Sequence, residues 1–142
     1  MRIRQLQSGD LGDLLSLYEH LHSSDSPSAP DTVAQSVWGE LMSSPNYRYY
    51  GVYVGGHLVS SCTLTVIPNL TRSCRPYGVI ENVVTHVDHR RKGYATALLR
   101  AALVDAWTAH CYKVMLLTGR KDEGTFRGFS RNEKQAFVAR PD

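Results

Sequence analysis

One segment, Ile80–Leu99, constrains the fold more than any other part of the chain. It begins as an apolar run typical of a β-strand, continues through a basic loop that contains Gly93, and ends in the amphipathic pattern of a helix. A second apolar run, Tyr112–Leu117, follows that helix. Because a strand, a helix and a strand in this order form a parallel pair, we expect Tyr77–Val87 and Tyr112–Leu117 to lie side by side in one sheet.

The loop between the first strand and the helix is suited to an anion. The first N–H groups of a helix have no acceptor within it, and the helix dipole adds about half a positive charge there. Gly93 has no Cβ and lets a ligand come close to the backbone, while Arg90, Arg91 and Lys92 add full charges. The pattern favours a phosphorylated ligand, although a solvated turn before a helix would contain similar residues. It matches neither GxxxxGK[ST] nor GxGxxG.

Length and composition indicate a globular protein of one domain, residues 1–142. Hydrophobic residues make up 42% and charged residues 20% of the chain, which excludes a disordered class. The net charge is only +3, and the basic residues are scattered except at Arg90, Arg91 and Lys92, so nucleic acid is not an expected partner. No apolar run is long enough to cross a membrane, and the first residues are too polar for a signal peptide. We therefore expect a cytoplasmic protein that binds no membrane.

The remaining patterns complete an α+β domain. Ser8 or Asp10 is expected to cap a first helix with Leu14, Leu15 and Leu17 on its apolar face. Asp31 or Thr32 is expected to cap a second helix, whose apolar face carries Val33, Val37 and Trp38. The other elements are predicted as strands at Ile3–Gln5, Tyr47–Val54, His57–Ile67 and Lys134–Arg140, a helix at Gly93–Ala109, a short helix near Lys121–Arg127, and loops at His22–Pro30 and Pro68–Pro76, with Gly55-Gly56 as a hairpin turn.

The motif Arg90-x-x-Gly93-x-Ala95 resembles the [Q/R]-x-x-G-x-[G/A] motif of the GNAT superfamily of N-acetyltransferases. The order of the predicted elements resembles that family over most of the chain. The resemblance implies a mixed, mostly antiparallel central sheet with helices on both faces. It also implies direct transfer of an acetyl group from acetyl-CoA to a primary amine of a small molecule or peptide, without a metal.

The resemblance also implies a binding site for acetyl-CoA. Backbone groups of Val83, Val84 and Thr85 would hold the pantetheine arm as an added strand would. The N–H groups of the loop and first helical turn would hold the pyrophosphate; these residues are Arg90, Arg91, Lys92, Gly93, Tyr94, Ala95 and Thr96.

Glu81 is the candidate general base, because it is a carboxylate inside an otherwise apolar strand and burial would raise its pKa. A surface-facing or core-bridging glutamate is the alternative. Strand alternation would turn Asn82 to the opposite face. Asn69 and Arg72 are candidate substrate-binding residues, or plain members of a polar loop.

Other polar side chains carry no assigned chemistry. His20, His22, His86 and His89 are interpreted as surface histidines, because they provide too few ligands for a metal site. Cys62, Cys74 and Cys111 are expected to be reduced thiols, mostly buried.

The sequence departs from the family between Arg127 and Gly128. About five residues are missing there, including the tyrosine that commonly protonates the leaving thiolate. The helix is then expected to end near Arg127, with Gly128 after it. We expect loss of the acid to lower the rate ~10²–10⁴-fold unless another group replaces it; the candidates are Tyr77, Tyr94, Tyr112 and Ser130. The alternative function is a non-catalytic acyl-CoA-binding or interaction module. A homodimer could form by pairing or exchange of the C-terminal strand.

Overall fold

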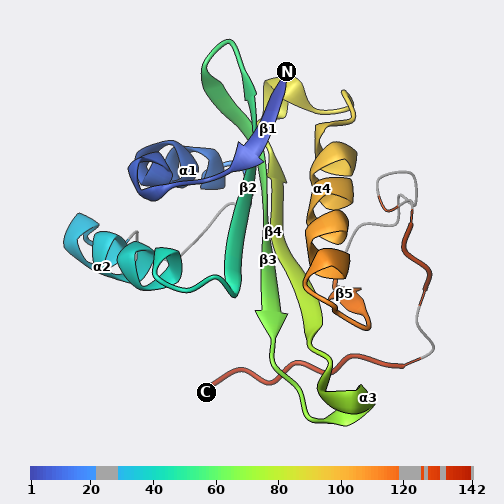
Figure 1. Ribbon diagram of the computed structural model, residues 1–142. Helices are drawn as coiled ribbons and strands as arrows, with labels where there is room; N and C mark the ends of the chain where they lie inside the picture. The colour runs from blue at the N-terminus through green and yellow to red at the C-terminus, as the bar shows by residue number, and fades with distance from the viewer. Residues whose placement is uncertain (22–28, 119–125, 127, 132–133, 142) are drawn as a thin grey trace.

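A computed structural model describes residues 1–21, 29–118, 126, 128–131 and 134–141 of the chain (Figure 1). The strands are β1 (Arg2–Gln5), β2 (Tyr47–Val54), β3 (His57–Ile67), β4 (Tyr77–Thr85) and β5 (Val114–Leu116). The helices are η1 (Ser8–Asp10), α1 (Leu11–Tyr18), α2 (Asp31–Met42), α3 (Thr71–Cys74), η2 (Val87–His89) and α4 (Tyr94–Thr108). None of the helices in these ranges is long and apolar enough to cross a membrane.

The five strands form one mixed sheet in the order β1-β2-β3-β4-β5, which confirms the predicted fold class. The first four strands are antiparallel neighbours, and β5 pairs with β4 in parallel, from Gly78 opposite Val114 to Ile80 opposite Leu116. The hairpin turn is also confirmed, because Gly55 and Gly56 have φ of 58° and 80°. Positive φ at both central residues matches the twist of a two-residue hairpin.

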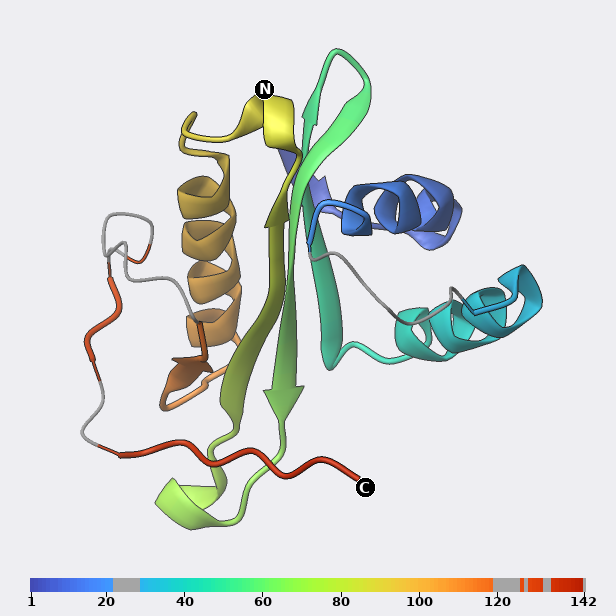
Figure 2. The ribbon, with the colours of Figure 1, turned by 180° about the vertical axis from the view of Figure 1, so that it is seen from behind.

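Helices cover both faces of the sheet, as expected (Figures 1 and 2). Helix α4 lies on one face, where Leu98, Leu99, Ala102 and Ala106 are buried against a core that includes Ile80. Helices α1 and α2 lie on the other face over a second core; its buried residues are Leu6, Leu14, Leu17, Trp38, Tyr49, Leu58 and Val84. The strand, loop and helix of the opening segment therefore belong to the α4 layer.

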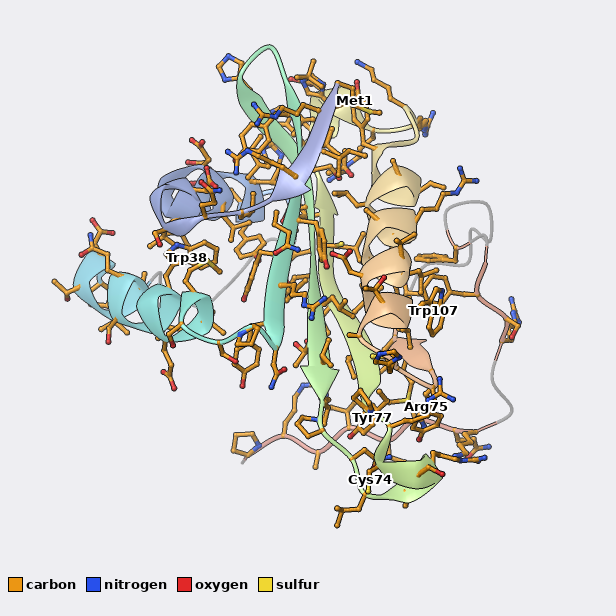
Figure 3. All side chains as sticks on the ribbon, viewed as in Figure 1. Met1, Trp38, Cys74, Arg75, Tyr77 and Trp107 are labelled. Atoms are coloured by element: carbon orange, nitrogen blue, oxygen red, sulfur yellow. The ribbon has the colours of Figure 1, made fainter. Side chains whose placement is uncertain are left out.

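Several predicted details of α1 and α2 are wrong. Asp10 does precede α1 and Pro30 precedes α2, but neither helix has a side-chain cap. Leu15, Val33 and Val37 are each more than two-fifths exposed, because each helix contacts the sheet over a narrow stripe. Trp38 is buried between α2 and the sheet, whereas Trp107 lies on the outer side of α4 and is half exposed (Figure 3).

Strand β4 is shorter than predicted and contains an irregularity. It ends at Thr85 rather than Val87, since Val87 begins η2. Thr63 pairs with Glu81 but Ser61 pairs with Val84, so two residues of β4, Asn82 and Val83, lie opposite Cys62 alone. This is a β-bulge, and it forms around Asn82, whose φ is 52°. Asparagine tolerates that left-handed conformation better than most residues do.

The segments after the hairpin and at the C-terminus also differ from the predictions. In the predicted loop 68–76, Arg72, Ser73 and Cys74 all have φ between 56° and 60°, so α3 is a left-handed turn. Residues 134–140 form no strand; Phe137 is 88% exposed. The short helix near Lys121–Arg127 falls largely outside the described residues. Without a C-terminal strand in place, the homodimer stays a prediction.

Asp10 joins the N-terminal strand to α1. Its carboxylate accepts two hydrogen bonds from Arg4, at 2.7 and 2.9 Å, one from the Gln7 N–H at 2.6 Å and one from the Tyr53 hydroxyl at 3.1 Å. These donors, Arg4 first, hold the Asp10 pKa well below its usual range. Because the pKa is lowered in the folded state, ionised Asp10 stabilises the fold at neutral pH.

We expect Asp10→Asn to lower the free energy of unfolding at pH 7 by about 1.5–3 kcal/mol, the usual contribution of hydrogen bonds to a charged group. The stabilisation by Asp10 is complete above the pKa of an unfolded aspartate, about 3.9, and is lost as pH falls below it. The variant should therefore lose less stability than the parent between about pH 5 and pH 2. Urea unfolding at several pH values measures this; Glu40→Gln, at an exposed site on α2, is the control. Equal acid sensitivity of parent and variant would contradict it.

Candidate functional site

A groove of about 490 Å³ opens where β4 ends and α4 begins. Thirteen residues line it: His20, Leu21, Val83, Val84, Thr85, His89, Arg90, Arg91, Lys92, Gly93, Tyr94, Ala95 and Thr96. All ten residues that the sequence assigned to a cofactor are among them. His20, Leu21 and His89 were not predicted. The first two lie in the turn that follows α1, far away in sequence, and only the packing of α1 on the sheet brings them here.

The backbone at the floor of the groove is bent so that it can hold an anion. Arg91 and Gly93 have φ of 63° and 82°, and α4 begins directly afterwards at Tyr94. Left-handed residues beside right-handed ones turn successive N–H groups toward a common point, and the helix dipole adds to the positive potential there. A Cβ on Gly93 would meet no atom within 4 Å. Glycine is therefore favoured here by its φ, with open space beside it.

The Arg90 side chain forms two hydrogen bonds to backbone carbonyls that the sequence did not indicate. Its Nε donates to the Thr85 carbonyl at 3.1 Å and its Nη2 to the His20 carbonyl at 3.2 Å. The guanidinium therefore joins the end of β4 to the turn that follows α1. All three basic residues of this loop, Arg90, Arg91 and Lys92, are exposed.

Three histidines, His20, His86 and His89, lie close together, and two of them, His20 and His89, line the groove. The ring centroids of His20 and His86 are 4.1 Å apart, and those of His86 and His89 are 5.5 Å apart. All three are half-buried, so each keeps some surface exposed to solvent, and the sequence did not indicate that they lie together; His22 lies outside the described residues. Within the described ranges, no group of three or more His, Cys, Asp or Glu side chains is arranged to hold a metal.

The edge of β4 changes along its length. Strand β5 pairs with it only up to Ile80. Beyond that residue, no described strand lies on the β5 side of β4 from Glu81 to Thr85. Val83, Val84 and Thr85 line the groove along this stretch. An unpaired strand edge offers backbone donors and acceptors to an extended ligand.

Glu81 lies in the middle of β4, immediately after the last residue paired with β5. It is exposed, so the burial expected for a base is absent here. Asn82 is exposed as well. The bulge interrupts the simple alternation along β4 at Asn82, and the orientation of Asn82 relative to Glu81 stays a prediction.

The candidate substrate residues Asn69 and Arg72 lie near the other end of β4, away from the groove. The Asn69 amide donates to the Thr71 carbonyl, the Thr71 hydroxyl and the Arg75 carbonyl at 2.9–3.2 Å, and so holds its own loop. The Arg72 guanidinium lies over the Tyr112 ring at 5.6 Å. Between them and Glu81 lies half of β4, about four residues or ~13 Å.

The four candidate replacements for the missing acid are scattered. Tyr94 lines the groove, whereas Tyr77 and Tyr112 pack edge to face at the opposite end of β4, with ring centroids 6.4 Å apart. Ser130 is exposed and follows a turn in which the Phe129 N–H donates to the Phe126 carbonyl.

Gly128, the first residue after the segment that is missing relative to the family, lies in that turn. Gly128 has a φ of 93°, the left-handed conformation expected for a residue that follows a helix. Phe126 and Phe129, on either side of it, pack against the core beneath α4.

The thiols fit the expectation in part. Cys62 and Cys111 are buried and Cys74 is exposed, and none of the three forms a disulfide. Burial raises the pKa of Cys62 to about 12, so this thiol, which lies opposite the bulge, stays neutral and unreactive.

Comparison with known proteins gives one family. The model of the acetyltransferase (GNAT) family matches residues 13–127. A glucosamine 6-phosphate N-acetyltransferase of Trypanosoma brucei brucei is 27% identical over 137 residues, which cover 95% of this chain and 92% of that protein.

Two solved structures show the same fold over the whole chain. A putative acetyltransferase from Agrobacterium tumefaciens has a TM-score of 0.89 and 39% identity, and covers 99% of this chain and 100% of its own. A predicted acetyltransferase from Clostridium acetobutylicum, solved with acetyl-CoA, has a TM-score of 0.79 over 97% of this chain and 95% of its own; at 15% identity it is similar in fold alone.

We expect Gly93→Ala to lower the free energy of unfolding by about 1 kcal/mol, because a Cβ disfavours the left-handed conformation. Gly39→Ala provides a matched control: Gly39 lies within α2, where a Cβ also meets no atom within 4 Å. That variant should gain up to about 1 kcal/mol from helix propensity. Urea unfolding measures both, and a Gly93→Ala variant as stable as the parent would contradict the left-handed conformation at this position.

Proposed function

Because this chain belongs to the GNAT family of acetyltransferases, we propose that it transfers an acetyl group from acetyl-CoA to a primary amine of a small molecule or peptide by direct transfer. The observation that carries the proposal is the groove, in which one loop, one helix N-terminus and one unpaired strand edge meet.

The residues of the groove fit the chemistry of a CoA ester. The left-handed residues Arg91 and Gly93 and the start of α4 suit a pyrophosphate. The β4 edge from Val83 to Thr85 suits the two amides of a pantetheine arm, which can pair with a strand as a peptide does. When bound, acetyl-CoA supplies the acetyl group as a reactive thioester. The solved Clostridium structure with acetyl-CoA, of the same fold, supports this ligand.

We assign Glu81 as the proton acceptor. An amine attacks through its lone pair, so an ammonium acceptor must first lose a proton, and a carboxylate can take it: the Glu81 carboxylate becomes a carboxylic acid as the ammonium becomes an amine. Glu81 follows the last residue paired with β5, and it is accessible to an acceptor because it is exposed.

One relative and the distances along β4 guide the choice of acceptors to test. The Trypanosoma relative is named for glucosamine 6-phosphate, which makes amino sugar phosphates the first acceptors to test. Asn69 and Arg72 are proposed substrate-binding residues only for a longer acceptor, because half of β4 separates them from Glu81. A peptide lying along β4 could contact both regions, whereas an amino sugar at Glu81 could not.

The double variant Arg91→Ala, Lys92→Ala should raise the Kd for acetyl-CoA about tenfold, because each exposed cation contributes up to about 1 kcal/mol toward a phosphate. Calorimetric titration measures the affinity. Arg100→Ala, an exposed cation on α4 outside the groove, is the control and should bind as the parent does. If the double variant binds unchanged, the phosphates do not lie at this loop.

Glu81→Gln should lower kcat by about 10²–10³ while the Kd for acetyl-CoA stays the same, because the amide cannot accept the proton. Release of free CoA thiol in a screen of amino sugars, amino acids and peptides measures turnover. Unchanged turnover would remove the assigned role of Glu81. A parent protein that binds acetyl-CoA and acetylates none of the amines would instead support the alternative, a non-catalytic acyl-CoA-binding or interaction module.

A further inference from the structure

Three buried hydroxyls on the α1 face of the sheet lack partners. Tyr18 Oη, Ser61 Oγ and Thr63 Oγ1 have no hydrogen bond among the described residues. Ser61 is fully buried and Thr63 is 6% exposed. A buried hydroxyl without a partner costs about 1–3 kcal/mol, and such groups are rare in folded proteins. An arrangement of neighbouring side chains that gives these hydroxyls partners would therefore be favoured.

Thr63 lies directly beside the proposed base. It pairs with Tyr49 on β2 and with Glu81 on β4, so the three residues form one row across the sheet. Residues directly opposite each other share a face, with Cβ atoms about 4.5–5.5 Å apart. A threonine hydroxyl and a glutamate carboxylate at that separation are within hydrogen-bond reach. Ser61 lies on the same face but opposite Val84.

Helix α1 brings Tyr18 to the same row. Burial raises the pKa of Tyr18 and of Tyr49, and the nearby Thr63 hydroxyl lowers both. The neighbouring Tyr49 and Cys62 raise the pKa of Tyr18 further. The titratable groups facing Thr63 are therefore Tyr18 from α1, Tyr49 from β2 and Glu81 from β4, while Cys62 adjoins it on β3. Both tyrosines stay protonated at neutral pH, so each is a donor.

We propose that Tyr18 and Thr63 form a hydroxyl chain that positions the Glu81 carboxylate. Tyr18 donates to the Thr63 oxygen, and the Thr63 O–H donates to the carboxylate. A hydroxyl can accept and donate at the same time, so one arrangement gives Tyr18 Oη and Thr63 Oγ1 the partners that they lack. The inference rests on the proposed role of Glu81 and adds two positioning residues to it.

The chain would have a defined effect on the proton acceptor. A hydrogen bond to the charged form of a carboxylate favours ionisation, and a second donor behind it strengthens the first. The hydroxyl chain would also hold the exposed Glu81 side chain in one orientation beside the bulge. Ser61, two residues away and opposite an apolar partner, would have no part in this.

The test is a carbon-13 NMR titration of the glutamate carboxylates in the free protein, with the Glu81 signal identified by its loss in Glu81→Gln. Thr63→Val, which keeps the shape and removes the hydroxyl, should move the midpoint of the Glu81 titration up by about one pH unit. Thr63→Ser should restore it. Tyr18→Phe should move it in the same direction by less, and Ser61→Ala should leave it unchanged. Thermal unfolding of each variant verifies that it is folded.

The proposal is overturned if Thr63→Val moves the midpoint by less than about 0.2 pH unit, or if Ser61→Ala moves it as much, since the effect would then come from general packing. Because the titration needs neither acetyl-CoA nor an acceptor, its result is separate from turnover. A parent protein without transferase activity that still shows the Thr63→Val shift would keep the hydroxyl chain and remove the enzyme role. An active enzyme in which Thr63→Val causes no shift would keep the enzyme role and remove the hydroxyl chain.

Discussion

Strand β4 contains one residue more than its neighbour β3 can pair with, and this mismatch determines how the site is arranged. Before the bulge at Asn82, Ile80 faces α4 and Glu81 lies in the row that faces α1; after it, Val84 faces α1. The residues that face α1 change from odd-numbered to even-numbered within one strand. Pairing with β5 ends at the same place, after Ile80. Strand β4 thus has two parts, which meet beside the bulge: one paired on both edges, and one with an edge available to a ligand because β5 ends.

The two parts are joined to different layers of the molecule. The closed part is fixed by β5 and by the core under α4, where Ile80 has no exposed surface. The open part is fixed at its end by Arg90, which ties Thr85 to the carbonyl of His20. The groove is therefore formed between α4 on one side and the turn that follows α1 on the other, and Glu81 lies where the two parts meet.

The local patterns of the sequence predicted the main features of this arrangement. Apolar runs and the Gly55-Gly56 turn gave the bounds of β2 and β3 as they stand in the structure, and the motif around Gly93 identified the residues of the groove. These features depend on neighbours in sequence. His20 and Leu21 reach the groove through tertiary packing, so no local pattern indicates them.

The wrong predictions also arise from contacts between elements that are far apart in the sequence. A bulge depends on how two neighbouring strands pair, so the sequence of β4 alone did not indicate the bulge at Asn82. Side chains such as Val33 and Val37 look like core in a helical pattern, yet α2 contacts the sheet mainly through Trp38. The roles of Glu81, Asn69 and Arg72 depend on a ligand and stay predictions.

The hydrogen bonds of Arg90 have a further consequence for entropy. Both acceptors are neutral carbonyls, so the guanidinium keeps its full charge beside the groove while its side chain is already held in place. Arg91 and Lys92 are exposed, and each must lose rotamer freedom, about 0.5–1.5 kcal/mol, when it is immobilised against a ligand. Arg90 is thus a preorganised charge: it attracts any anion that enters the groove without a further loss of its own side-chain rotamer freedom.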